Sequence, residues 1–267
     1  MPEGDTIARA ADTLRRWLVG RELTAVDARD VALRHRASKL VGHTVDAVEA
    51  RAKHLLITVD DQVIHSHMRM TGSWHVYERG ERWRKRRDAM RLVLEAGDRV
   101  AVCFDAPVVQ VVRAGDVDAL PGLATLGPDV LVDIDVPVAV RRFRDLPAST
   151  PVGDALLDQT VVSGLGNIWR CEALYAQRVH LATAVGDIDD ERLAALVDSG
   201  ARMMGASAAR TSARPRAQVY KRTGQPCRRC GTAIVARRLG RDNRTAYWCA
   251  TCQVTPDTQD SDKATDK

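Results

Sequence analysis

The stretch HLLITVDDQVIHSHM, residues 54–68, sets the character of the first half of the chain. Apolar and polar residues alternate on both sides of Asp60-Asp61, and a period of two is typical of a half-buried β-strand. A pair of aspartates between two such runs marks a tight turn. The stretch therefore predicts a β-hairpin.

The same alternation extends from about Leu23 to Val112. It includes the runs TVDAVEAR (44–51), MRLVLEAGDRVAVCF (90–104) and VVQVV (108–112), with Gly97-Asp98 at another turn. Short strands joined by tight turns indicate an antiparallel sandwich or barrel. Ahead of them, residues 3–19 have a helical spacing of apolar residues, which predicts an N-terminal helix.

The second half of the chain has a different organisation. Residues 121–136 lose the alternation and contain several turn-breaking residues, which predicts a linker. Apolar residues at helical spacing then predict helices over residues 138–145, 153–161, 167–178 and 189–204. Residues 254–267 carry no apolar anchor, which predicts a disordered tail. The whole pattern predicts an α+β protein with more than one domain.

The positive charge of the chain is concentrated in one segment. The formal net charge is +5, yet residues 205–244 hold eleven Lys or Arg residues against one acid. Such a concentration favours a polyanionic partner, and nucleic acid above all. The ordinary alternative is a solvated basic surface. No run reaches the roughly 20 apolar residues of a membrane helix, and the start is not a secretion signal, so we expect a cytoplasmic protein.

Four of the six cysteines form two pairs, Cys227 with Cys230 and Cys249 with Cys252, separated by 18 residues. Two C-x-x-C turns at this separation predict four thiolates around one Zn²⁺ ion. A closed set of four protein ligands predicts a structural ion and not a catalytic one. Disulfides are the alternative, and a reducing cytoplasm disfavours them.

A glycine-rich turn, SGLGNIWRCEALY, spans residues 163–175. Gly164 and Gly166 precede a helix for which Asn167 is the predicted N-cap. Backbone amides at such a helix start can bind an anion. With the predicted helix 153–161 before it, the segment favours a helix–turn–helix that holds a phosphate, although a simple helix cap remains the alternative.

The first residues, MPEGDT, gain meaning if the partner is DNA. Removal of the methionine frees the secondary amine of Pro2, and an α-amine has a pKa of about 7.7–8.0. Such an amine can attack C1′ of a deoxyribose and form an iminium that draws off electrons. Glu3 can then move protons. The alternative is an ordinary helix start, where proline and acids are common.

Taken together, these motifs resemble one family. PEGD at Pro2, RAKHLL around Lys53, HMRMTG around Met70, GLGN at Asn167 and the terminal cysteine pattern with Arg244 are similar to the formamidopyrimidine-DNA glycosylase/endonuclease VIII family. The resemblance spans residues 2–253 in order. It implies an N-terminal β-sandwich, a helix–two-turn–helix domain with a zinc finger, and a bifunctional glycosylase and AP lyase that excises oxidised bases from DNA.

The resemblance also implies a role for each site residue. Pro2 would be the nucleophile and Glu3 the acid/base, and Lys53 would contact the phosphate beside the lesion. Met70 would fill the space that the flipped nucleotide leaves, with core packing at a strand end as its alternative. The remaining predicted DNA contacts are Gly164, Gly166, Asn167, Lys221 and Arg244. For Lys53 and Arg244 the alternative is an ordinary surface cation.

One departure from the family pattern concerns the lesion. The branch that acts on oxidised purines typically carries an Arg-Phe pair after a central strand, and the comparable stretch here, FDAPVVQVV (104–112), has none. This resembles the endonuclease VIII branch, which prefers oxidised pyrimidines. Lys221 also stands where purine-branch relatives often have glycine. A non-catalytic zinc-ribbon protein that binds nucleic acid is the competing hypothesis, and it gives Pro2 and Glu3 no role.

The resulting domain prediction has five segments. They are a catalytic domain (1–120), a linker (121–136), a helix–two-turn–helix domain (137–215), a zinc finger (216–253) and a tail (254–267). We expect a monomer that acts on damaged DNA, duplex or single-stranded, at the bacterial nucleoid.

Overall fold

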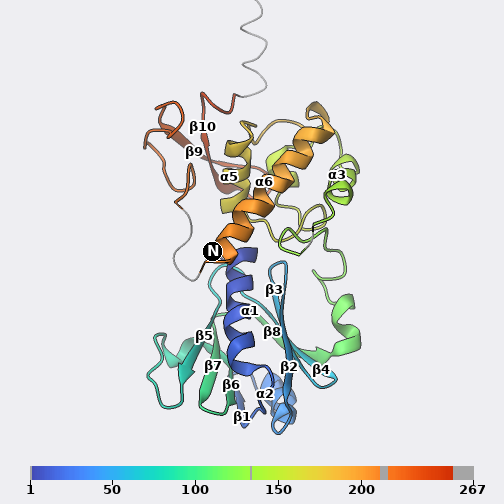
Figure 1. Cartoon of the computed structure of the whole chain (residues 1–267), viewed down its shortest axis with the longest axis vertical. Helices are drawn as coiled ribbons and strands as arrows, with labels where there is room; N and C mark the ends of the chain where they lie inside the picture. The colour runs from blue at the N-terminus through green and yellow to red at the C-terminus, as the bar shows by residue number, and fades with distance from the viewer. Residues whose placement is uncertain (1, 133, 211–215, 255–267) are drawn as a thin grey trace, which may run out of the picture. The chain divides into compact units, whose positions relative to one another are not determined.

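The computed structural model describes residues 2–132, 134–210 and 216–254, and the chain divides into two compact units between Ala124 and Thr125 (Figure 1). This division falls inside the segment 121–136 that the sequence predicts as a linker. The five-segment division itself stays a prediction. Of the predicted tail, residues 255–267 lie outside the described residues.

The N-terminal unit contains two four-stranded antiparallel sheets. One sheet has the order β1 (Ala25–Ala28), β6 (Met90–Ala96), β7 (Arg99–Phe104), β5 (Ser73–Glu78). The other has the order β2 (Val45–Arg51), β3 (His54–Val59), β4 (Gln62–His67), β8 (Val108–Arg113). The antiparallel sandwich is confirmed, and both predicted turns, Asp60-Asp61 and Gly97-Asp98, join consecutive strands as expected.

Helix α1 (Gly4–Leu18) precedes the sheets and packs against β2 and β5 of the same unit. Its buried residues include Ile7, Ala11, Leu14 and Leu18, the face that the sequence spacing indicates. These side chains join the strand residues in one apolar core. The short helix α2 (Val31–Ala37) follows β1, and 3₁₀ segments lie at Ser38–Leu40, Arg87–Ala89 and Ala114–Ala119.

The C-terminal unit combines helices with one β-hairpin. Its elements are α3 (Val136–Arg144), α4 (Val152–Ala155), α5 (Asn167–Ala176), a 3₁₀ turn (Val185–Asp187), α6 (Asp190–Ala208), β9 (Ile234–Leu239) and β10 (Arg244–Cys249). Ala246 and Trp248 of β10 belong to the same apolar core as Phe143 of α3 and Leu196 of α6. The hairpin is therefore built into the helical unit.

Two details of the predicted helices are wrong. The predicted helix over residues 153–161 ends at Ala155, because the Asp158 carboxylate accepts hydrogen bonds from the backbone N–H (2.9 Å) and the hydroxyl (2.7 Å) of Thr160. An aspartate that bonds its neighbouring backbone favours a turn over a helix. Asn167 is also not the N-cap of α5. Gly166 is the N-cap, with an extended backbone (φ −127°, ψ −165°), and Asn167 is the first helical residue.

Candidate functional site

The start of α1 places a partly exposed proline next to a buried carboxylate. Glu3 is the N-cap residue, and its carbonyl accepts the N–H groups of Thr6 (2.8 Å) and Ile7 (3.1 Å). Its side chain is buried, whereas Pro2 keeps partial exposure. The positive end of a helix dipole stabilises a negative charge at this position, so the helix start favours a carboxylate here.

Lys53 lies in the two-residue turn between β2 and β3, and it is half-buried. Arg51 pairs with His54 across this turn, and Ala52 has a positive φ of 54°. Two-residue hairpins of this kind fix the direction of the side chains on the turn. Lys53 belongs to the same unit as Pro2 and Glu3, and the two strands that its turn joins both contact α1.

Three histidines lie behind the Lys53 turn on adjacent strands. Gln110 Nε2 lies 3.0 Å from His65 Nδ1, and His65 Nε2 lies 2.8 Å from His54 Nδ1. His67 contacts His54 edge-on, with ring centroids 4.6 Å apart. Burial, and after it the nearby positive charges, lowers the pKa of His54 to about 3 and of His67 to about 4. The rings are therefore neutral at pH 7 and support the turn without adding charge.

Met70 follows β4 in a tight loop and is 63% exposed. A methyl group at Gly72 would lie 2.7 Å from Met68 Cα, so this loop has no room for a side chain at Gly72. Exposure on this scale excludes the alternative that Met70 packs into the core at a strand end. An exposed apolar side chain on a tight loop suits a wedge between bases, and this role stays a prediction.

In the C-terminal unit, Asn167 connects α5 to the hairpin. Its Nδ2 donates to the Thr245 carbonyl (2.8 Å), and its Oδ1 accepts from the fully buried Arg170. Gly164 has a positive φ of 94°, and its N–H donates to Gln159 Oε1 (3.0 Å). This N–H is therefore not open to a phosphate, so Gly164 does not contribute its amide to the anion site that the sequence predicts.

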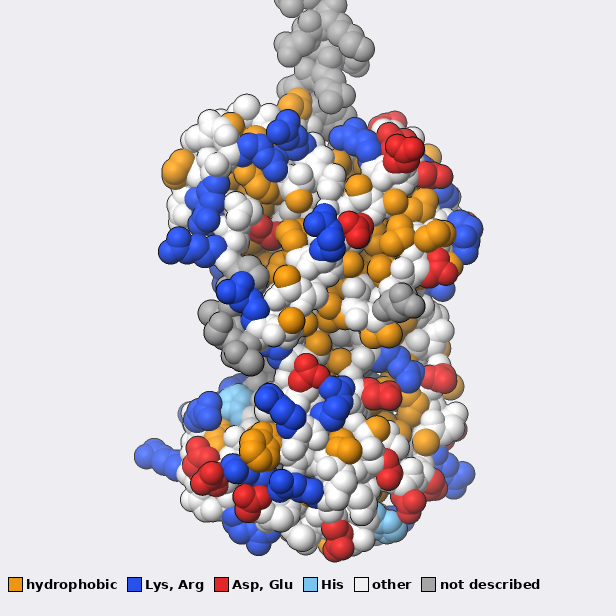
Figure 2. All heavy atoms as spheres, in the orientation of Figure 1, with side chains coloured by type: hydrophobic (Ala, Val, Ile, Leu, Met, Phe, Trp, Pro, Cys, Tyr) orange, Lys and Arg blue, Asp and Glu red, His pale blue; other side chains and the backbone are white. Residues whose placement is uncertain are grey.

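Arg244 begins β10, directly before the residue that Asn167 holds. Its Nε lies 3.2 Å from Asp242 Oδ2, and its side chain is 38% exposed. Lys221 has a positive φ of 56°, which explains why a glycine would suit this position, and its Nζ lies 5.9 Å from the centre of the Tyr220 ring. Figure 2 shows Lys and Arg side chains spread over the region of β9 and β10.

The four paired cysteines come together as one metal site. The Sγ atoms of Cys227, Cys230, Cys249 and Cys252 all lie within 4.8 Å of one another. The Cys230–Cys249 and Cys227–Cys252 separations are 3.4 Å and 4.0 Å, close to the roughly 3.8 Å expected between thiolates around a tetrahedral zinc ion. The thiols are not joined as disulfides. The donor set therefore fits one structural Zn²⁺, as the sequence predicts.

Sequence reasoning missed two buried charged residues of α5. Glu172 accepts the backbone N–H groups of Gln218 (2.8 Å), Val219 (3.1 Å) and Tyr220 (2.9 Å), which attaches the segment before the finger to the helix. Arg170 bonds Asn167 and the Gly153 carbonyl. Charged residues inside an otherwise apolar helix were the available signal, because a buried charge needs such partners.

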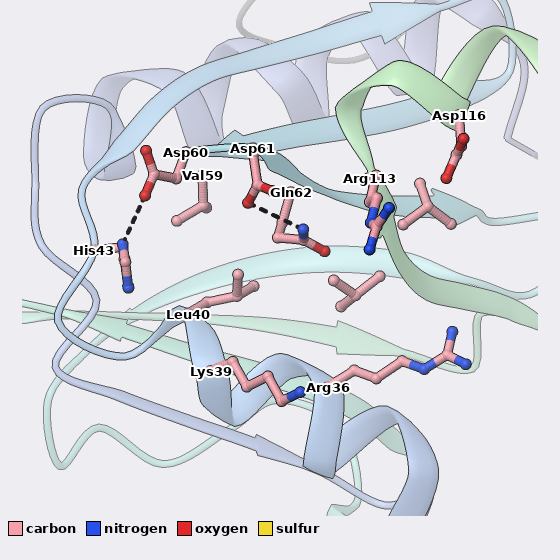
Figure 3. A pocket seen from close by; sticks show the side chains of 12 residues that line it. Arg36, Lys39, Leu40, His43, Val59, Asp60, Asp61, Gln62, Arg113 and Asp116 are labelled. Atoms are coloured by element: carbon pink, nitrogen blue, oxygen red, sulfur yellow. Dashed lines mark hydrogen bonds and ion pairs between the residues drawn. The ribbon is translucent and has the colours of Figure 1, made fainter.

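A separate cavity of about 600 Å³ lies at the far ends of β3 and β4 from Lys53 (Figure 3). Arg36, Lys39 and Arg113 line it together with Asp60, and His43 Nδ1 lies 3.0 Å from Asp60 Oδ2. Six strand residues, about 20 Å, separate its rim from the Lys53 turn. This mixed-charge cavity is therefore not part of the site at Pro2.

Comparison with known proteins identifies the family. Residues 1–107 match the formamidopyrimidine-DNA glycosylase N-terminal domain, residues 126–215 its H2TH domain, and residues 224–254 a zinc finger found in FPG and IleRS. A "Probable endonuclease 8 2" of Streptomyces coelicolor is 37% identical, over 96% of this chain and 95% of that protein. A "DNA-(apurinic or apyrimidinic site) lyase Nei2" of Mycolicibacterium smegmatis is 37% identical, over 95% of this chain and 99% of that one.

Endonuclease 8 of Escherichia coli is 32% identical, over 95% of this chain and all of that protein. Among solved structures, Lactococcus lactis Fpg in a complex with damaged DNA has a TM-score of 0.84 at 22% identity, covering 95% of this chain and all of that chain. This likeness shows the shared fold. The chain therefore belongs to the formamidopyrimidine-DNA glycosylase/endonuclease VIII family and is a DNA glycosylase and AP lyase of base excision repair.

Proposed function

We propose that the Pro2 nitrogen is the nucleophile of this enzyme and that oxidised pyrimidines are its main substrates. The observation that carries the proposal is the start of α1, where a partly exposed imino acid adjoins the buried Glu3 carboxylate at the positive end of a helix. Once Met1 is removed, Pro2 carries a free secondary amine that can act as a nucleophile, next to a carboxylate that can move protons.

The reaction begins once Met1 is removed. The Pro2 nitrogen forms a bond to C1′ as the bond from C1′ to the damaged base breaks, and the base leaves with a proton. Opening of the sugar gives an iminium, which acidifies the C2′ proton. Loss of that proton expels the 3′ phosphate, a second elimination expels the 5′ phosphate, and water releases the sugar fragment from Pro2. Glu3 protonates the sugar ring oxygen and shuttles the protons.

The remaining site residues hold the DNA during this reaction. A base inside the stack is out of reach, so the nucleotide is flipped, and we assign Met70 to the space it leaves. Lys53, Lys221 and Arg244 supply positive charge to the phosphates. The Asn167 side chain holds β10, the β-strand that begins at Arg244. Phosphate contacts of this kind position the DNA and weaken with salt.

The preference for pyrimidines is supported by the short connection between β7 and β8. Only Asp105, Ala106 and Pro107 lie between these strands, and Asp105 is paired with Lys85 at 2.8 Å. This connection has no Arg-Phe pair and no length to present one. The 32–37% identical relatives named endonuclease 8 are consistent with the same branch.

The test is to incubate the protein with borohydride and duplexes that contain thymine glycol, 5-hydroxycytosine, 8-oxoguanine or an abasic site. We expect trapped protein–DNA adducts on the abasic and pyrimidine lesions, and at least tenfold slower excision of 8-oxoguanine. Faster trapping on 8-oxoguanine would overturn the substrate assignment. Absence of an adduct on every duplex would overturn the nucleophile.

We further propose that the enzyme works as a monomer on the DNA of the bacterial nucleoid, in the cytoplasm. The four cysteines of one chain suffice to form the zinc site. No helix of the described residues is long and apolar enough to span a membrane. The competing non-catalytic zinc-ribbon protein is set aside, because the family models match the glycosylase domain over residues 1–107 as well as the finger.

A further inference from the structure

The hairpin of the finger is tied to the helical part of its unit on both sides of Arg244. On one side, Asn167 Nδ2 donates to the Thr245 carbonyl at 2.8 Å. On the other side, the carboxylate of Asp154, in α4, accepts the backbone N–H of Arg241 at 3.1 Å from Oδ2. Arg244 thus lies between two hydrogen-bonded backbone positions, Arg241 and Thr245, that are four residues apart in the chain.

The contact at Asp154 is close and specific. Gly240 has a positive φ of 81°, and a Cβ atom there would collide with Asp154 Oδ1. Glycine adopts this backbone conformation without strain and brings no side chain. The sequence therefore lets the tip of the hairpin, residues 240–243, approach the Asp154 carboxylate closely enough for its hydrogen bond with the Arg241 N–H.

Apolar packing holds the strands of the hairpin as far as Leu239. Ala246 and Trp248 are buried in the core of the unit, and Leu239 packs against that core. At the tip, an open cavity of about 720 Å³ is lined by Pro147, Thr150 and Asp154 on one side and by Arg241 and Asp242 on the other. A segment beside open space depends on its hydrogen bonds for a defined position.

The position of the tip also determines the setting of the Arg244 side chain. Asp242 lies in the tip, and its Oδ2 is 3.2 Å from Arg244 Nε. An arginine that is preorganised in this way loses less conformational entropy when it binds a phosphate. A tip that moves freely would carry both Asp242 and Arg244 with it.

We propose that Asp154 is a positioning residue for DNA binding. It fixes the finger hairpin, so that the backbone at Arg244 is already in place when the Arg244 side chain contacts a phosphate. The inference rests on the proposed phosphate contact of Arg244. It adds a residue outside the finger and outside the glycine turn to the DNA-binding machinery. Asp154 itself is acidic, so it acts through the hairpin and not through a contact with DNA.

The sign of the effect separates this role from simple electrostatics. Removal of a carboxylate beside a DNA-binding surface strengthens binding if only charge matters. The positioning role predicts the opposite for Asp154→Ala, because Arg244 must then be ordered during binding. We expect a two- to tenfold weaker affinity, the range that corresponds to ordering one long side chain.

The experiment measures the affinity of the zinc-loaded, full-length protein for a duplex with a tetrahydrofuran abasic-site analogue, over a range of salt concentrations. The variants are Asp154→Ala, Asp154→Asn, Arg244→Ala and the Asp154→Ala/Arg244→Ala double variant. Asp198→Ala is the matched control, because its carboxylate is exposed on α6 and pairs with Arg202 in its own helix. Zinc content and the thermal midpoint are measured for each protein.

We expect Asp154→Asn to bind within twofold of the parent, since its amide oxygen can still accept the Arg241 N–H. Asp198→Ala should bind at least as well as the parent. In the Arg244→Ala background, Asp154→Ala should change the affinity by less than twofold, because coupled residues are not additive. Full additivity, or equal weakening by Asn and Ala, would overturn the positioning role.

The phosphate contact of Arg244 and the positioning role of Asp154 are tested by different outcomes. If Arg244→Ala leaves affinity and salt dependence unchanged, the phosphate contact of Arg244 is wrong, and the positioning role falls with it. If Arg244→Ala weakens binding and Asp154→Ala does not, only the positioning role is wrong. If Asp154→Ala loses zinc, Gly240→Ala tests the same contact from the hairpin side, and normal affinity with zinc retained would contradict the proposal.

Discussion

At the scale of single residues, the histidines behind the Lys53 turn make the stability of the protein depend on pH. His54 is neutral in the folded protein, because burial and then the charges of its neighbours lower its pKa from 6.5 to about 3. Between these two pH values, the unfolded chain therefore binds a proton at His54 that the folded protein does not bind. By linkage, the stability is fully present above pH 6.5 and is lost as the pH falls toward 3.

Acid unfolding tests this term. We expect the free energy of unfolding to fall by on the order of 3 kcal/mol between pH 6.5 and 4 from His54. In His54→Gln this slope should be shallower, because the amide does not titrate. His35→Gln, at an exposed position of α2, is the control and should follow the parent curve. Denaturant titrations at several pH values measure the slopes, and equal slopes for all three proteins would contradict the account.

Substitutions of Lys221 test the effect of backbone strain on stability and the effect of charge on DNA binding separately. A side chain in the left-handed region costs about 1–2 kcal/mol, whereas glycine is unstrained there but loses more chain entropy on folding. We therefore expect Lys221→Gly to leave the free energy of unfolding within about 1 kcal/mol of the parent. If Lys221 contacts a phosphate, the salt slope of DNA binding should fall by about one.

Lys221→Asn is the matched variant for this prediction, because asparagine tolerates positive φ and carries no charge. It should show the same loss of salt slope as Lys221→Gly. An unchanged slope in both variants would remove Lys221 from the DNA contacts.

Individual residues differ in how far their sequence context predicts them. The metal role of Cys227 and Cys230 follows from spacing alone, because tetrahedral zinc constrains the spacing of its ligands. The partners of Asn167 do not follow from spacing, because its side-chain amide donates to the carbonyl of Thr245, 78 residues further along the chain. A local motif predicts a cap, and only the folded unit shows that the side chain is used to hold another element.

At the scale of elements, the zinc site joins the two segments that flank the hairpin β9–β10, in addition to the packing of β10 into the apolar core of the C-terminal unit. Because binding of the metal is coupled to folding of such a module, a chelator should release the ion and abolish DNA binding while the β-sandwich unit stays folded. Calorimetry should then show that the transition of the N-terminal unit is retained. Loss of both units on chelation would contradict this separation.

Cys230→Ser is the point variant for the same element. Cys230 is the exposed ligand, so its loss removes a metal bond with little loss of packing. We expect weaker zinc retention and weaker DNA binding. Cys103→Ala, a buried thiol of β7 in the other unit, should keep one zinc ion per chain.

Among the elements, the strands and α1 are predictable because period-two and helical spacings show directly in the residues. The prediction of a helix over residues 153–161 was wrong. Leu156 and Leu157 fit a helical pattern, but the turn at Asp158–Thr160 prevents a helix from continuing to residue 161. The contact of Asp154 with Arg241 joins residues 87 positions apart. Spacing rules contain no information about such distant pairs.

At the scale of the whole molecule, charge and chemistry lie in different units. The proposed nucleophile and acid/base belong to the unit of residues 1–124, and the four cysteines of the zinc site and the basic segment belong to the unit of residues 125–267. The sequence predicts this division through the loss of alternation after residue 120. It also predicts the activity, because Pro2 and the cysteine pairs are recognisable without the fold.

Mapping of the borohydride-trapped adduct tests the central claim most directly. The protein is trapped on an abasic duplex and digested, and the modified peptide is sequenced by mass spectrometry, with an undamaged duplex as the control. The account predicts a sugar remnant on the nitrogen of Pro2, in chains that have lost Met1, and no adduct in the control. A remnant on Lys53 or any other side chain, or full activity in chains that retain Met1, would contradict it.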